Sequence, residues 1–230
     1  MVAVTDTVLD LAISSVREVN QALRALPDGA RARIQNPRGR HNLAVGIDRE
    51  IDVLIDGPAG YYVGGLGKHA SITVDGPAGW GVGENLMSGN IAVNGNASQS
   101  AAASAHGGTV IIHGDAGLRA GISLKGATLA VAGDVAEFTG FMAQAGTILV
   151  GGDAGEHLGD SLYEAVIYVA GRIRGLGTDA QVEELDQADV AAVEAIVKLA
   201  GFDHVAAQNV TRVGSARRLY HFSNHQAGSY

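Results

Sequence analysis

Three aspartates recur with a 19-residue period, each directly after a glycine: Asp115, Asp134 and Asp153. If the segments that carry them stack on one another, their carboxylates form a row about 4.8 Å apart. Such a row could bind calcium or supply the acid pair of a β-helical carbohydrate-active enzyme. The equivalent position earlier in the chain holds Pro58, Pro77 and Asn96, which are turn residues. A structural role in a turn is therefore the favoured interpretation.

Two further motifs have partial chemical signatures. Gly65-x-Gly67-x-x-Ala70 resembles a dinucleotide-binding loop, but the strand expected at Ser71–Val74 follows it where a helix N-terminus would be needed. His221 and His225 have helical metal-ligand spacing, but the intervening residues do not favour a helix, so we interpret them as tail histidines. The sequence predicts no catalytic, cofactor-binding or metal-binding residue on this chain.

The elements that carry the aspartates belong to a repeat. Seven glycines share the same 19-residue period without an insertion, namely Gly57, Gly76, Gly95, Gly114, Gly133, Gly152 and Gly171. The residues two and four positions before each glycine are always Val, Ile or Leu, which places them on one face of a strand. Positions between them, such as Leu54, Thr73 and Ala92, are mixed and are expected to face outward.

Each repeat is too short and too rich in glycine for a strand–helix–strand unit, so identical strands can stack only in parallel. Because parallel crossovers are right-handed, the sequence predicts an all-β fold, a right-handed parallel β-helix of about seven 19-residue coils. A second glycine row recurs in each coil, at Gly64, Gly83, Gly121, Gly140 and Gly159, with Ala102 in its place once. These residues are expected to turn corners with positive φ or to allow close backbone approach.

The ends of such a stack need covers, because the terminal coils expose strand edges and apolar interior. Apolar spacing predicts a helix from about Thr7 to Leu26, and a second stripe predicts a helix that ends at Gly201. The acidic residues before and in that helix (Glu183, Glu184, Asp186, Asp189 and Glu194) are interpreted as a solvated face and first-turn charge. The expected divisions are an N-terminal helical cap (1–29), a connecting segment (30–50), the β-helix (51–181), a C-terminal helix (182–201) and a tail (202–230).

Bulk properties exclude several classes of function. The net charge of −8 does not fit a nucleic-acid-binding face, and the lack of cysteine excludes disulfides and thiolate metal sites. The N-terminus lacks the basic and apolar regions of a signal peptide, and no run of about 18 apolar residues occurs. We therefore expect a cytoplasmic protein without membrane or nucleic-acid partners.

The coil motif also carries a family resemblance. Segments such as ITVDGPAGWGVGENLMSG and TILVGGDAGEHLGD resemble the β-helical C-terminal domain of the glutamate synthase large subunit, over roughly residues 42–177. The chain resembles stand-alone forms of this domain, such as the small subunit of N-methylglutamate synthase, whose tail is similar to residues 212–222. The same β-helix occurs as one subunit of formylmethanofuran dehydrogenase and of the bacterial formyltransferase/hydrolase complex, which is the alternative assignment.

The resemblance implies a non-catalytic assembly subunit of a glutamate-synthase-like oxidoreductase or transferase complex in methylamine metabolism. It implies an amidotransferase-like subunit and a synthase subunit as partners in a hetero-oligomer. FMN and an iron–sulfur cluster are expected in the synthase partner, and no cofactor is expected on this chain.

The tail combines arginines with apolar side chains, as interface hot spots do: Arg217, Arg218, Leu219, Tyr220 and Phe222. We expect the segment from about Gln208 to Tyr230 to dock a partner subunit. The alternative is that this segment folds back along the coil stack.

Overall fold

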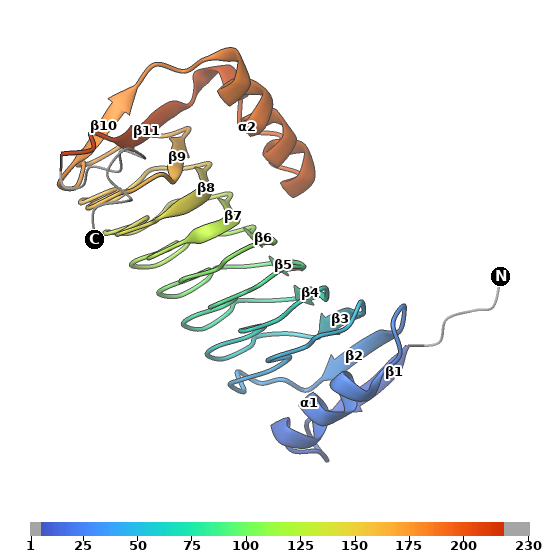
Figure 1. The fold of residues 1–230 in the computed structure, drawn as a ribbon. Coiled ribbons are helices and arrows are strands. Elements are labelled where there is room, and N and C mark those ends of the chain that lie inside the picture. The colour runs from blue at the N-terminus through green and yellow to red at the C-terminus, as the bar shows by residue number, and fades with distance from the viewer. Residues whose placement is uncertain (1–5, 219–230) are drawn as a thin grey trace, which may run out of the picture.

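The structure, a computed structural model, describes residues 6–218 of the chain. Eleven strands form one continuous sheet in the order β1-β2-β3-β4-β5-β6-β7-β8-β9-β11-β10 (Figure 1). The strands are β1 (Thr7–Asp10), β2 (Arg31–Gln35), β3 (Asp52–Ile55), β4 (Ser71–Val74), β5 (Asn90–Val93), β6 (Thr109–Ile112), β7 (Lys125–Val131), β8 (Ala145–Val150), β9 (Val166–Val169), β10 (Ala180–Glu183) and β11 (Thr211–Ser215). The helices are α1 (Val16–Ala25), α2 (Gln187–Ala200) and the short 3₁₀ helix η1 (Ala207–Asn209).

Strands β3–β9 confirm the predicted coils. Neighbouring strands are parallel and keep the 19-residue register, as in the pairs Val53↔Ile72 and Ile72↔Ile91. A second wall repeats the register through single bridges such as Ala59↔Ala78 and its successors up to Ala154↔Ile173. The fold is therefore a right-handed parallel β-helix with helical caps at its two ends.

The interior of the coils is a continuous apolar column. The aliphatic residues two and four positions before each repeat glycine are buried in every coil, for example Val93 and Val131, and the cluster runs from Leu11 to Val213. Each buried Val, Ile or Leu side chain contributes about 1.5–3 kcal/mol relative to an exposed one. Asn94, which points outward after Val93, is exposed as expected.

The second glycine row satisfies both expectations made for it. Gly64, Gly121 and Gly140 have φ values of +67°, +68° and +72°, in the left-handed region. Space is also lacking, because a Cβ at Gly121 would lie 2.5 Å from Ile148 Cδ1. Ala102 takes the place of glycine once, with φ of 56°. For Ala102, the position equivalent to Ile148 is occupied by Leu129. Leu129 is the one leucine in that core row, whose other members are valine and isoleucine.

The N-terminal end corrects two expectations. The helix predicted from about Thr7 is wrong in its first half, because residues 7–10 form β1, which pairs with β2 as a further parallel strand. Helix α1 begins only after Ser15, whose side chain and that of Glu18 form a capping box. The segment 30–50 contains β2 in register with β3 and buries Ile34 and Ile47, so it forms an additional coil at the start of the stack.

The C-terminal end combines a helix with a returning strand. Helix α2 has Asp186 as N-cap, with Asp189 completing a capping box, and it ends at Gly201 with φ of 69°, as predicted. Strand β11 then lies antiparallel between β9 and β10. Residues 211–215 therefore fold back onto the coil stack, as the alternative interpretation of the tail required.

Helix α2 and the segment after it cover the outer face of the last coils (Figure 1). A second apolar cluster joins Ala130, Leu149, Tyr168, Val193, Ala200, Phe202, Val205, Ala207 and Val210. The outward positions between the core residues are thus partly exposed at β3–β5 but buried at β7–β9. No helix within residues 6–218 is long and apolar enough to cross a membrane.

The corner glycine row generates the first prediction. Gly121→Ala should destabilise the protein by about 2–3 kcal/mol, since it forces an L-residue into the left-handed region and a methyl group against Ile148. The control Ala102→Gly should change stability by less than about 1 kcal/mol, because it loses one buried methyl group and relieves an unfavourable φ. Urea unfolding measures both variants, and equal destabilisation by the two changes would contradict this account of the corner.

Candidate functional site

The aspartate row forms a hydrogen-bonded ladder with the backbone of the neighbouring coil. Asp115 Oδ1 accepts a bond of 2.9 Å from the Asp134 N–H, and Asp134 Oδ1 accepts one of 2.7 Å from the Asp153 N–H. The ladder starts at Asn96, whose Oδ1 accepts from the Asp115 N–H at 3.0 Å. One oxygen of each of these side chains is therefore used to hold the next coil, as expected for a turn residue.

The ladder ends at an arginine. The Arg172 N–H donates to Asp153 Oδ1 at 2.8 Å, and its guanidinium donates to Asp153 Oδ2 at 2.8 and 3.1 Å. The backbone N–H of Arg172, followed by its side chain, holds the pKa of Asp153 below its usual range. A lowered pKa keeps this carboxyl ionised at neutral pH, whereas a general acid requires a raised pKa.

The repeat glycines make room for this ladder. An added Cβ at Gly133 would collide with Asp115 Oδ1, and one at Gly152 would collide with Asp134 Oδ1. Neither glycine has φ in the left-handed region, so the need is for space. The Gly-Asp dipeptide of the repeat is thus one structural unit, in which each glycine accommodates the side chain from the coil before.

A shallow surface cavity of about 270 Å³ lies beside the ladder. It is lined by Asp115, Ala116, Asp134, Val135, Ala136, Glu137, Asp153, Ala154, Gly155 and Arg174. Within residues 6–218, no group of three or more His, Asp or Glu side chains could hold a metal ion. The structural interpretation of the row rests on its hydrogen bonds, because one oxygen of each carboxylate accepts a backbone N–H of the next coil.

The remaining sequence candidates are dispersed. The Gly65–Ala70 loop leads into strand β4, and Leu66 within it has a left-handed φ of 58°, so it forms a coil corner without a helix N-terminus. Leu219, Tyr220, His221, Phe222 and His225 lie outside the described residues. Arg217 donates to Glu164 at 3.0 Å and the Arg218 N–H donates to Asp179 at 2.9 Å, at the last coils.

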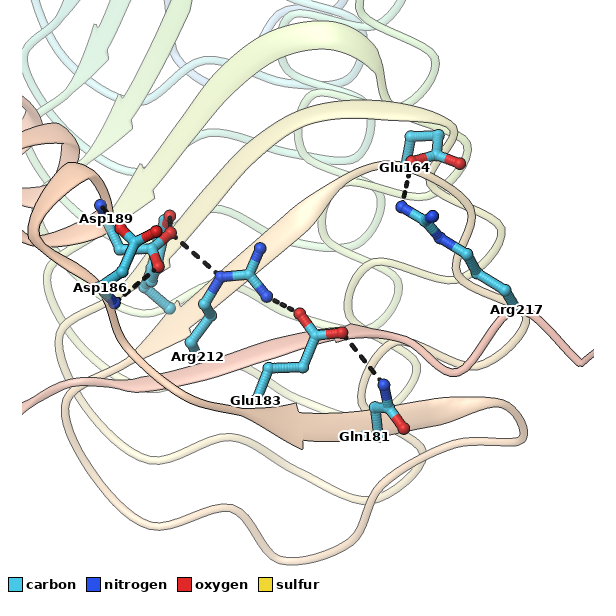
Figure 2. Close-up of polar contacts among 8 residues, drawn as sticks. Glu164, Gln181, Glu183, Asp186, Asp189, Arg212 and Arg217 are labelled. Atoms are coloured by element: carbon cyan, nitrogen blue, oxygen red, sulfur yellow. Dashed lines mark hydrogen bonds and ion pairs between the residues drawn. The ribbon is translucent and has the colours of Figure 1, made fainter. Parts of the chain in front are cut away.

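A polar network at the C-terminal end was not predicted (Figure 2). The Tyr168 hydroxyl donates to Asp189 at 2.5 Å, Arg212 Nε donates to the same carboxylate at 3.0 Å, and Arg212 also pairs with Glu183. Burial, followed by the bond to Asp189, raises the pKa of Tyr168. Asp189 carries the predicted first-turn charge, but its side chain is only 13% exposed. Glu183 lies in β10 and pairs with Arg212, so the expected solvated helix face is wrong for both residues. The network joins β9, β10, β11 and α2, and so stabilises the packing of the C-terminal cap against the last coil.

A row of exposed aromatic rings also escaped the sequence interpretation. His41 and Tyr61 are stacked with their centroids 4.3 Å apart, and Tyr61 and Trp80 with theirs 5.3 Å apart. Tyr61 and Trp80 stand one 19-residue repeat apart, so the repeat itself was a sufficient signal for this pair. His41 belongs to the preceding coil and lies 20 residues before Tyr61. Because this spacing differs from the 19-residue period, the repeat did not predict that His41 joins the row.

The ladder generates the second prediction. Replacing Asp115, Asp134 and Asp153 together by alanine removes the three acceptors, at about 1 kcal/mol each, and should lower the free energy of unfolding accordingly. The matched triple asparagine variant keeps an acceptor oxygen at each position, as Asn96 does in the native chain, and should unfold close to wild type. Thermal and urea unfolding compare the two. An asparagine variant as unstable as the alanine variant would show that the negative charge itself is required.

Comparison with known proteins places the chain in a family. No protein-family model matches the sequence. The chain is similar to Protein GlxC of Rhizobium meliloti (strain 1021), with 46% identity over 226 residues that cover 97% of this chain and 99% of that protein. The similarity therefore includes the end caps as well as the coils.

Proposed function

Because the chain belongs to the family of the GlxC protein, we propose that it is a structural subunit of a glutamate-synthase-related enzyme complex, without an active site of its own. The observation that carries this proposal is the use of the aspartate row. The carboxylates best placed for chemistry bind the backbone of the next coil. The coil motif, which resembles the β-helical domain of glutamate synthase, supports the same role.

The finer proposal is that the complex is an N-methylglutamate synthase that uses methylamine and glutamate in the cytoplasm. In it, an amidotransferase-like subunit handles the nitrogen, and a synthase subunit carries FMN and an iron–sulfur cluster. The β-helix supplies a rigid body between these subunits. Its register leaves little freedom to bend, because each coil is bonded to both neighbours.

The tail remains the proposed contact for one partner, with Arg217 and Arg218 at its start. A truncation that tests this contact must leave strand β11 in place, because Val213 within it is fully buried. A chain that ends at Arg218 leaves β11 intact and removes residues 219–230. This truncation should keep the melting temperature of the full chain and lose one partner subunit on affinity purification.

The fourth prediction tests the function itself. The tagged full chain, purified from its native cell, should bring down a flavin-containing synthase subunit and an amidotransferase-like subunit. The triple asparagine variant of Asp115, Asp134 and Asp153 should support turnover within a few-fold of wild type, since it keeps the ladder. Loss of turnover with assembly intact would contradict a structural role, and a metal-dependent hydrolase as partner would favour the formyl-transferring complexes.

A further inference from the structure

We infer that the aromatic column formed by His41, Tyr61 and Trp80 is a docking surface for an acidic, apolar segment of another protein subunit. This inference rests on the proposed function, since it names a place on the β-helix where a second subunit of the complex binds. Trp80 is 49% exposed and Tyr61 47% exposed, although large aromatic side chains contribute most when they are covered. Exposed Trp and Tyr side chains together are typical of interface hot spots.

The column is held rigid by the backbone beneath it. The Tyr61 N–H donates to His41 Nδ1 at 2.9 Å, which fixes the imidazole against the next coil. Glycines leave room for the rings: a Cβ at Gly79 would lie 2.7 Å from Tyr61 Cδ1, and one at Gly60 would collide with His41 Nδ1. A surface that is already ordered loses little conformational entropy when a partner binds.

The borders of the column add apolar and cationic groups. Pro58 and Pro77 are exposed beside it, three residues before Tyr61 and Trp80 in their coils. Arg38 and Arg40 are exposed at its N-terminal border. Within residues 6–218 neither has a carboxylate oxygen within 4.0 Å, although Arg38 interacts electrostatically with Asp10, and the nearby Asp56 is paired with Arg33 at 2.6 Å. A cavity of about 480 Å³ opens beside them, lined by Gln35, Asn36, Pro37, Arg38, Asp56 and Pro58.

These charges select the kind of partner. An aromatic and proline surface bordered by two exposed guanidinium groups is complementary to carboxylates next to apolar side chains. A second copy of this chain fits poorly, because a two-fold interface on this patch would bring both pairs of arginines together. A sugar has few ring faces to stack on here, since both faces of Tyr61 are covered by His41 and Trp80 and one face of Trp80 is covered by Tyr61.

The experiment uses the complex purified through a tag on the full chain. A photo-crosslinking amino acid at position 80 should join a partner subunit at a segment that contains Asp or Glu. The double variant Tyr61→Ala and Trp80→Ala should weaken retention of that subunit by roughly 30-fold, the effect of truncating hot-spot aromatics. Arg38→Glu with Arg40→Glu should also weaken it, and should reduce the salt dependence of binding.

The control is Met142→Ala, since Met142 is 38% exposed but lies several coils away from the column. It should retain the subunit, and all variants should melt within a few degrees of wild type because the changed side chains are exposed. A complex that survives the loss of both aromatics unchanged would overturn this inference and leave the proposed function intact. Crosslinking to a second copy, or Trp80-dependent binding of an oligosaccharide, would also overturn it. If affinity purification of the tagged wild-type chain recovers no other subunit, that result would contradict both the proposed function and this inference.

Discussion

The constraint on which this structure depends is the exact repetition of register. From β3 to β9 the strands repeat with a 19-residue period, so the side chains of each strand lie against their counterparts in the next coil. A row is therefore stable only if its residue type tolerates contact with itself. Inside the coils, stacked aliphatic side chains such as Ile72 and Ile91 meet this condition because their contact removes apolar surface from water. On the outer surface, the stacked carboxylates meet the same condition only because each accepts a hydrogen bond from a backbone N–H of the next coil.

This constraint explains how much of the fold could be predicted from the sequence. Where the 19-residue period holds, register and facing follow directly, and the seven coils were predicted correctly. The first coils were missed because the pairs Thr7↔Ala32 and Arg31↔Asp52 are separated by longer stretches of chain, so β1 and β2 do not share the period. Strand β11 was missed for a different reason. It pairs antiparallel with β9, so nothing in its sequence repeats the coil pattern.

The polar residues likewise fall into two groups, those whose role the repeat predicts and those whose role it does not. The turn role of the aspartates could be predicted because Pro58, Pro77 and Asn96 share their position in the repeat. The network of Tyr168, Asp189 and Arg212 could not, since it joins three elements whose contact depends on how the cap folds back. The first-turn position of Asp189 was visible in the sequence, but its second use in the network was not. What lies outside the repeat depends on tertiary packing, which spacing alone does not reveal.

The functional account follows from the same geometry. The carboxylates of the aspartate row hold neighbouring coils together, and fold alone does not assign chemistry to this wall. Tyr61 and Trp80, one repeat apart, place two stacked aromatic rings at exposed positions of neighbouring coils. The similarity to GlxC extends over 97% of the chain and so includes both the coils and the caps.

The most direct test of the central claim is a comparison of two insertions by thermal unfolding. One duplicates a full coil, Gly95–His113, and the other adds a single alanine between Ile91 and Ala92 in strand β5. The full coil preserves every row, so the longer chain should melt within a few degrees of wild type. The single residue moves Val93 from the core to the outer face and should abolish cooperative unfolding. A protein that tolerates the single alanine and loses its fold with the extra coil would contradict the account.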